Sequence, residues 1–370
     1  MSSVKSLKIM IGGGGTGGHI FPALAIAQEI RLRRPDAEFL FLGAQGRMEM
    51  TKIPEAGFEI VGLPIAGLQR SFSADNLKLP FKIFSSLQKA MALVRSFKPD
   101  IAVGVGGYAS LPLLLASRVL GVPYLIQEQN SFAGLTNKLL GKSAKAICVA
   151  FGEMERYFPA KRLKLTGNPV RKDLLESHVS QFEAINHFGL QPGLQTIFVM
   201  GGSLGARTIN ESVAKSLKAW KREGYQLIWQ TGTAFAPKAA QLIKEDYYPG
   251  FITQPFIKEM NFAYAAADLV ISRAGALSLA EICMTGKASI LIPSPNVAED
   301  HQTKNAMTLV KQKAAKMIAD ADSRDLLTQT VIEMLQNPHQ LDTIGMAAHS
   351  MAKPEATQNI VNHIFEIAKA

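Results

Sequence analysis

The stretch KIMIGGGGTGGHIFPALAIAQEI, residues 8–30, decides the fold. It opens with an apolar run typical of a buried strand, continues through a glycine-rich loop at 12–18, and passes into a helical pattern over about 20–34. A strand, a glycine-rich loop and a helix in that order are typical of the first unit of a nucleotide-binding α/β sheet. The pattern G-x-G-x-x-G fits the loop twice, from Gly12 and from Gly13.

The rest of the chain alternates short apolar runs with helical patterns, which predicts parallel sheets with helices on both faces. Strands are expected at 7–11, 37–43, 100–106, 123–129, 145–150, 195–200, 225–232, 268–275, 288–295 and 314–320. The pattern restarts at residue 195 with QTIFVMGGSLGARTINESVAKSLKAW. We therefore predict two Rossmann-like α/β domains, 1–168 and 169–351, with a cleft between them and a last helix, about 352–370, that packs back on the first.

The amino-acid composition indicates which classes of partner the protein could bind. The 370 residues carry a formal net charge of +10, which favours phosphorylated substrates or an anionic membrane surface. Because no dense Lys/Arg run or nucleic-acid-binding motif occurs, no nucleic acid is expected. The two cysteines, Cys148 and Cys283, have apolar neighbours and no metal-ligand spacing, which predicts buried thiols in a reducing compartment and no metal site. With no signal peptide before the first loop, we expect a cytoplasmic protein docked on a membrane face.

The first glycine-rich loop has more than one interpretation. A dinucleotide needs an acidic residue at the tip of the second strand, but that strand ends in FLFLGAQGRM. Arg47 could instead serve a 2′-phosphate, so NADP remains an alternative, as does a turn needed only for packing. His19 follows Gly17 and Gly18 at the helix start, where the helix dipole favours the neutral imidazole that can accept a proton. A catalytic and a structural role for His19 both stay open on these grounds.

Three stretches of the second half predict a nucleotide site. GGSLGAR, 201–207, repeats the phosphate-loop pattern and offers the Ser203 hydroxyl. In SRAGALSLAEICMTG, 272–286, a helix starts at Ala276 with Arg273 nearby, and Glu281 in its second turn could hold both hydroxyls of a ribose. NVAEDHQTKNA, 296–306, supplies polar groups that suit hydrogen bonds to a sugar nucleotide better than a metal ion.

Two further stretches have competing interpretations. QEQNSFAGLTNK, 127–138, places four polar residues at a strand tip, where they suit hydroxyl and amide recognition or form an ordinary polar loop with Asn130 as a turn or cap residue. The stretch 77–97 predicts a helix with Phe81, Phe84, Leu87, Met91 and Val94 in the core. Off that stripe, an apolar patch with lysines alongside would dock on an anionic leaflet or pack under a loop: Leu77, Leu79, Ile83, Lys78, Lys82 and Lys89.

Taken together and in this order, GGTGGHIFPALAIA, GVGGYASLP, QEQNSFAGLTNK, TGNPVR, GGSLGAR, SRAGALSLAEI and EDHQTKNA resemble the MurG family over essentially the whole chain. The resemblance implies the GT-B fold, two Rossmann-like domains with the site between them. It implies an inverting transfer of GlcNAc from UDP-GlcNAc to the MurNAc C4 hydroxyl of undecaprenyl-pyrophosphoryl-MurNAc-pentapeptide, without a metal or other cofactor. It also implies a peripheral protein on the cytoplasmic face of the bacterial membrane.

The resemblance also implies site residues. Thr16, Gly17 and Gly18 fall at the junction of donor and acceptor. For the donor, the resemblance implies that Asn130 contacts GlcNAc, that Arg171 and Ser203 contact the diphosphate, and that Ile257 contacts the uracil. It implies further donor contacts at the phosphate and ribose by Ala276, Leu277, Ser278 and Glu281. Gln302 also contacts the donor by this resemblance.

His19 is the family's candidate base. The family often has His where Gln127 stands, and this departure leaves His19 or Glu128 as the base. Alternatives are another GT-B enzyme that glycosylates a different lipid, an NADP oxidoreductase, and a lipid-docking protein without catalysis.

Overall fold

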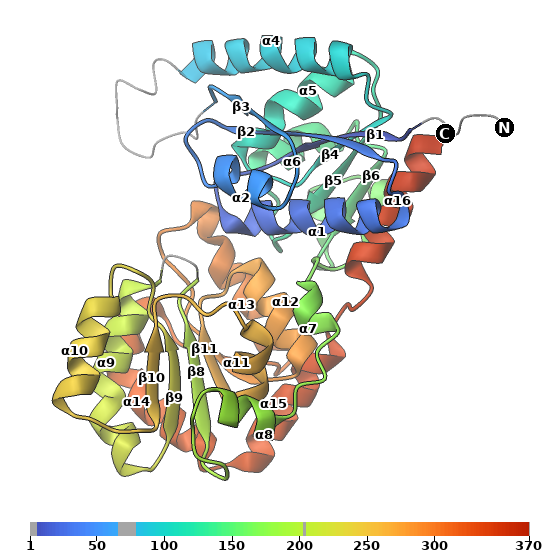
Figure 1. The fold of residues 1–370 in the computed structure, drawn as a ribbon. Coiled ribbons are helices and arrows are strands. Elements are labelled where there is room, and N and C mark those ends of the chain that lie inside the picture. Colours follow the sequence, from blue (N-terminus) through green and yellow to red (C-terminus); the bar gives the residue numbers. More distant parts are fainter. Residues whose placement is uncertain (1–5, 66–78, 203–204, 370) are drawn as a thin grey trace. The chain divides into compact units, whose positions relative to one another are not determined.

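The computed structural model describes residues 6–65, 79–202 and 205–369. The chain divides into two compact units, Met1–Val170 with Glu355–Ala370, and Arg171–Pro354. Each unit is built on one sheet whose strand pairs are all parallel (Figure 1). The predicted parallel α/β architecture is therefore confirmed, and the cleft between two domains stays a prediction.

The first unit holds a seven-stranded sheet in the order β3-β2-β1-β4-β5-β6-β7. Its strands are β1 (Lys8–Gly12), β2 (Glu38–Ala44), β3 (Ile60–Leu63), β4 (Ile101–Gly104), β5 (Tyr124–Glu128), β6 (Ala146–Val149) and β7 (Leu163–Leu165). The central strands are buried apolar runs, as the sequence predicts. The edge strands β3 and β7 were not among the expected strands.

Helices cover both faces of this sheet (Figure 1). They are α1 (Gly17–Arg33), α2 (Glu49–Glu55), α4 (Leu79–Phe97), α5 (Leu111–Val119), α6 (Leu135–Gly141) and α16 (Ala356–Lys369), with 3-10 turns η1 (Tyr108–Ser110), η2 (Met154–Arg156) and η3 (Ala160–Arg162). The terminal helix α16 buries Ile360 and Ile364 in the same apolar cluster as Ile20 and Ile30 of α1. On the other face, side chains of α4 and α5, among them Ala90 of α4, pack in a second apolar cluster.

The second unit holds a six-stranded sheet in the order β10-β9-β8-β11-β12-β13. Its strands are β8 (Thr196–Met200), β9 (Gln226–Gln230), β10 (Phe251–Gln254), β11 (Leu269–Ser272), β12 (Ala288–Leu291) and β13 (Lys316–Met317). Its helices are α7 (Lys172–Leu175), α8 (Gln181–His187), α9 (Arg207–Arg222), α10 (Ala236–Glu245), α11 (Met260–Ala266), α12 (Ala276–Thr285), α13 (His301–Lys311), α14 (Ser323–Leu335) and α15 (Pro338–Ser350), with η4 (Ala298–Asp300) and η5 (Asp320–Asp322). Figure 1 shows α9, α10 and α14 along one face of the sheet, and α11 and α12 on the other.

Helix α4 differs from its predicted packing. Phe81 and Phe84 are 78% and 61% exposed, so the prediction that they belong to the core is wrong. The helix buries the stripe Ser86, Ala90 and Val94, four residues apart, and both phenylalanines lie off that stripe.

Only part of the predicted patch beside that stripe lies within the described residues. Leu77, Lys78 and the side chain of Leu79 lie outside what the structure describes, and Ile83 is half-buried. Among the helices that the structure describes, none has the length and apolar character needed to cross a bilayer.

Candidate functional site

In the first unit, neighbouring strands bring three candidate segments to one edge of the sheet. Strands β1, β4 and β5 are parallel neighbours, so the segments that follow them leave from the same carboxyl edge. These are the first glycine-rich loop, the GVGGY segment and the polar residues after Gln127. A Cβ on Gly107, which has φ +74°, would lie 2.6 Å from the carbonyl oxygen of Gly14, so the first two segments are in close contact.

A buried carboxylate holds the first loop. Glu49, at the start of α2, is 0% exposed and accepts hydrogen bonds from the amide of Gly15, at 3.1 and 3.0 Å, and from the amide of Ala44 at 3.0 Å. A Cβ on Gly14 would lie 2.1 Å from Glu49 Oε1, so the carboxylate occupies the space that a side chain there would need. The Gly15 amide is therefore committed to the protein. Glu49 was not predicted from the sequence, although an acidic residue at a helix start just after a buried strand could have indicated it.

The amino end of α1 is open to a ligand's negative charge. Thr16 is the N-cap, its side chain makes no capping hydrogen bond, and the first helical turn has no acidic residue. Thr16 and Gly18 are exposed, whereas Gly17 is half-buried. Amide groups at such a helix end attract anions.

His19 lies two residues into this helix and is half-buried. Its Nδ1 is 3.1 Å from Oε1 of Gln129, a residue 110 positions away. The structure thus brings the predicted base next to the polar tip of β5.

The polar tip of β5 is mostly turned inward. Gln127, Glu128 and Gln129 are 0%, 2% and 1% exposed, so they are not placed to contact a substrate hydroxyl directly, whereas Asn130 is half-exposed. Glu128 Oε1 accepts from the Asn130 amide at 3.1 Å, and Oε2 accepts from the Gly134 amide at 2.9 Å and from Asn137 Nδ2 at 2.8 Å. A buried carboxylate with these hydrogen bonds holds its loop in place.

In the second unit, a glutamine joins two segments of the predicted nucleotide site. Gln230, the last residue of β9, donates from Nε2 to the carbonyl of Gly202 at 3.4 Å and accepts at Oε1 from the amide of Ile257 at 3.0 Å. Ile257 itself is 1% exposed. Ser203 lies outside the described residues. Gln230 was also not predicted from the sequence. A polar residue at the end of a buried strand could have indicated it.

Helix α12 begins at Ala276, as predicted, with Gly275 as its N-cap. No side-chain cap and no acidic residue occupy its first turn, which contains Ala276, Leu277 and Ser278. This amino end, like that of α1, suits a phosphate group.

Glu281 projects from the second turn of α12 toward Tyr264, whose hydroxyl donates to Glu281 Oε2 at 3.1 Å. Glu281 as a whole residue is partly exposed, whereas its carboxyl group is buried. Burial raises the pKa of this carboxyl to about 7, and the guanidinium of Arg171 and the Tyr264 hydroxyl limit the rise. The charged and neutral forms of this carboxyl group are therefore close in free energy near pH 7.

The other predicted residues of this unit are placed as follows. Arg171 is the N-cap of α7, and its Nε lies 3.5 Å from Asp173 Oδ1. Arg273 Nη1 donates to the carbonyls of Ile292 and Pro293 at 3.0 and 3.2 Å and also pairs with Asp320, so this nitrogen braces the loop after β12. Gln302 Oε1 accepts from the amide of Ser294 at 2.8 Å in the same loop.

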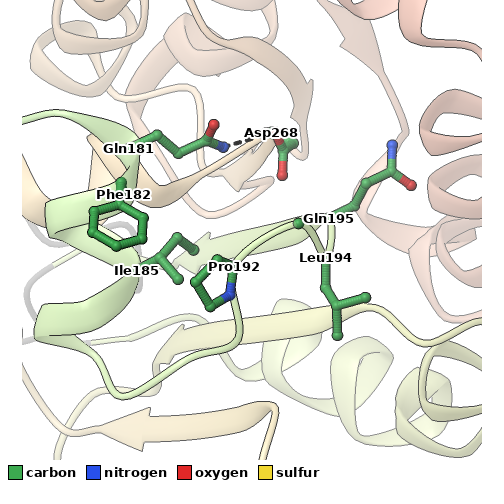
Figure 2. A pocket seen from close by; sticks show the side chains of 8 residues that line it. Gln181, Phe182, Ile185, Pro192, Leu194, Gln195 and Asp268 are labelled. Atoms are coloured by element: carbon green, nitrogen blue, oxygen red, sulfur yellow. Dashed lines mark hydrogen bonds between the residues drawn. The ribbon is translucent and has the colours of Figure 1, made fainter.

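A separate hollow of the second unit has a volume of about 250 Å³. Figure 2 shows the side chains that line it. Leu194 and Gln195 line it just before β8, and Asp268 just before β11, so it lies at the amino ends of these strands. Asp268 accepts from Gln181 Nε2 at 3.0 Å and from the Thr196 amide at 2.7 Å. Its carboxylate is thus used within the fold, at the sheet edge opposite to the candidate site.

Comparison with known proteins gives matches along the whole chain. The family model "Glycosyltransferase family 28 N-terminal domain" matches residues 9–149, and "Glycosyltransferase family 28 C-terminal domain" matches 196–360.

Two curated relatives carry the name "UDP-N-acetylglucosamine--N-acetylmuramyl-(pentapeptide) pyrophosphoryl-undecaprenol N-acetylglucosamine transferase". The protein from Cytophaga hutchinsonii is 52% identical, over 99% of this chain and 98% of the relative. The one from Parabacteroides distasonis is 50% identical, over 98% and 99%. Among solved structures, Acinetobacter baumannii MurG is 31% identical with a TM-score of 0.78, and the match covers 98% of this chain and 100% of that one.

Proposed function

This chain belongs to glycosyltransferase family 28, among the MurG enzymes, and from that premise we propose how its residues share the reaction. The fold is GT-B, and the activity is the transfer of GlcNAc from UDP-GlcNAc to undecaprenyl-pyrophosphoryl-MurNAc-pentapeptide, the step from lipid I to lipid II in peptidoglycan synthesis. The observation that carries this conclusion is 52% identity over nearly the full length of the chain.

The second unit binds the donor. Glu281 accepts hydrogen bonds from the ribose hydroxyls, because the residue is partly exposed and, within the described residues, its carboxylate accepts only from the Tyr264 hydroxyl. The amino end of α12, at Ala276, Leu277 and Ser278, binds the phosphates. Arg171 and Ser203 complete the diphosphate site. Ile257, whose side chain is buried, offers its backbone to the uracil. Gln302 and Arg273 support the donor through their contacts in the loop after β12.

The first unit binds the acceptor and supplies the base. His19 takes the proton of the MurNAc C4 hydroxyl while that oxygen attacks the anomeric carbon of GlcNAc, and the bond from this carbon to UDP breaks with inversion. The amino end of α1, at Thr16, Gly17 and Gly18, lowers the energy of negative charge that develops at this junction. Asn130, the half-exposed residue of the β5 tip, contacts the transferred sugar. The contacts of Glu128 favour His19 over Glu128 as the base.

We also propose that the protein binds peripherally to the cytoplasmic face of the membrane through α4. Phe81 and Phe84 are large exposed apolar side chains on this helix, with Lys82 between them. The net charge of +10 favours an anionic surface. Phe81→Ser with Phe84→Ser should weaken binding to vesicles that contain anionic lipid, while Phe182→Ser, which alters an equally exposed phenylalanine of the second unit, should not. Equal losses in both proteins would contradict the assignment.

The transfer itself is tested with UDP-GlcNAc and a lipid I analogue. We expect one UDP released for each disaccharide-linked lipid formed. Transfer to diacylglycerol instead would support another lipid glycosyltransferase, and NADPH binding seen by fluorescence without transfer would support an oxidoreductase. Either result would overturn the proposal.

A further inference from the structure

We propose that Gln129 is a positioning residue that holds His19 in the one neutral tautomer able to accept a proton at Nε2. The inference rests on the proposed role of His19 as the base. It follows from the hydrogen bonds of the Gln129 amide, which is 1% exposed.

The orientation of the Gln129 amide is fixed by groups that can only accept. Its Nε2 lies 2.7 Å from the carbonyl oxygen of Val105 and 3.3 Å from that of Gln127, and it also contacts Gln127 Oε1. A backbone carbonyl has no proton to give, so the amide nitrogen, with its two hydrogens, has to face it. The amide oxygen therefore points to the other side, toward His19.

The amide oxygen in turn fixes the imidazole. Gln129 Oε1 lies 3.1 Å from His19 Nδ1, and an oxygen without a proton can only accept, so Nδ1 carries the hydrogen. The opposite tautomer would set two lone pairs against each other at this distance. In a neutral imidazole with a proton on Nδ1, the lone pair is on Nε2, which is the nitrogen that can take a proton from the acceptor hydroxyl.

A buried network supports this orientation of the Gln129 amide. Asn168 Nδ2 donates to the backbone carbonyl of Gln129 at 3.0 Å, and Gln127 Nε2 donates to Asn168 Oδ1 at 3.0 Å, so the Gln127 amide presents its oxygen to Gln129 Nε2. Gln127 and Asn168 are 0% and 4% exposed. A flipped Gln129 amide would place its oxygen against the Val105 carbonyl and leave buried groups without partners.

The imidazole ring is also confined sterically. A Cβ on Gly106 would lie 3.0 Å from His19 Nδ1, and one on Gly107 would lie 3.1 Å from His19 Cδ2. The ring thus packs against this segment with one nitrogen directed at Gln129. The partner that orients the ring is thus an uncharged amide.

The test separates orientation from folding by a matched pair of variants. Gln129→Met removes the contact with His19, and Gln127→Met removes an amide from the same buried network without touching His19 directly. We expect Gln129→Met to lower kcat by on the order of 10-fold or more, with KM for UDP-GlcNAc within about twofold of wild type, as for loss of a group that holds a base in its correct tautomer. Gln127→Met should keep most of kcat, because the Val105 carbonyl still orients the Gln129 amide. Equal losses of kcat in both variants would overturn the proposal.

The tautomer is read directly in the intact enzyme labelled with ¹⁵N-histidine. The chain has seven histidines, and the His19 signals are assigned by their loss in His19→Asn. We expect Nδ1–H and an unprotonated Nε2 in wild type and in Gln127→Met, and an appearance of the Nε2–H form in Gln129→Met. A wild-type His19 in the Nε2–H form would overturn the proposal without reference to any variant. Because these spectra do not depend on turnover, they still report on Gln129 if His19→Ala shows that His19 is not the base.

Discussion

Glu128 and Glu281 lie one in each unit and have opposite surroundings. Both oxygens of Glu128 accept from backbone amides, and Asn137 adds a further donor. Among the described residues, the Glu281 carboxylate accepts from the Tyr264 hydroxyl alone, and burial raises its pKa to about 7. The hydrogen bonds of the Glu128 carboxylate thus go to its own loop, whereas the Glu281 carboxylate can accept further hydrogen bonds.

Glu49 repeats the Glu128 arrangement beneath the first glycine-rich loop. In the first unit, then, buried carboxylates shape loops, and we assign the chemistry to a half-buried histidine. In the second unit we assign the carboxylate of Glu281 to ligand binding. The number of donors around each glutamate is the structural difference on which these two assignments rest.

The largest expected effect is on turnover in His19→Ala. Loss of a general base should lower kcat by about 10²- to 10⁴-fold, while affinity for UDP stays near wild type because we assign donor binding to the second unit. Steady-state transfer assays and calorimetric titration measure the two quantities. A loss of UDP affinity as large as the loss of kcat would break the division between the units.

The next effect is on donor binding in Glu281→Ala. Hydrogen bonds to a charged group contribute about 1.5–3 kcal/mol, so UDP affinity should fall by roughly 10- to 100-fold. Glu223→Ala, which removes an exposed glutamate of the same unit, is the control and should bind normally. Normal UDP affinity in Glu281→Ala would remove the ribose role.

Glu128→Gln should affect stability instead of binding. Its amide would set an NH₂ group against donors that Glu128 now accepts from, which should cost about 1–3 kcal/mol of unfolding free energy. Urea denaturation measures this cost. An unchanged midpoint would show that these contacts are not needed to hold the loop.

The smallest effect is a dependence of donor affinity on pH. If Glu281 binds the ribose as proposed, its ionised form is the better acceptor for both hydroxyls, so UDP-GlcNAc should bind more tightly as pH rises through about 7. Stability should change in the opposite direction: a raised pKa in the folded state contributes stability that is full below the ordinary glutamate value of 4.5 and is lost as pH rises through about 7. Glu281→Gln should flatten both curves. UDP-GlcNAc is the better probe, because free UDP has a phosphate that itself titrates near this range.

The parts of the fold that could not be predicted are edge strands. The expected strands correspond to β1, β2, β4, β5, β6, β8, β9, β11, β12 and β13, whereas β3, β7 and β10 were missed. All three missed strands lie at an edge of their sheet. An edge strand is buried on fewer sides, as the exposed Lys164 and Leu165 of β7 show, so it needs no continuous apolar run.

The site shows the same limit. The start of α12 and the position of His19 at a helix start follow from local pattern, and the structure has both. Glu49 and Gln230 act on segments that lie 34 and 27 residues away, and a single sequence does not display such contacts. Phe81 and Phe84 were misplaced because α4 packs through the smaller side chains Ser86 and Ala90.

The most direct test of the donor count is calorimetric titration of UDP-GlcNAc into Glu281→Gln and Glu128→Gln at pH 8, with both proteins shown to be folded. We expect a loss of about 10- to 100-fold in affinity for Glu281→Gln and a change within about twofold for Glu128→Gln. Normal affinity in Glu281→Gln, or an equal loss in both proteins, would contradict it.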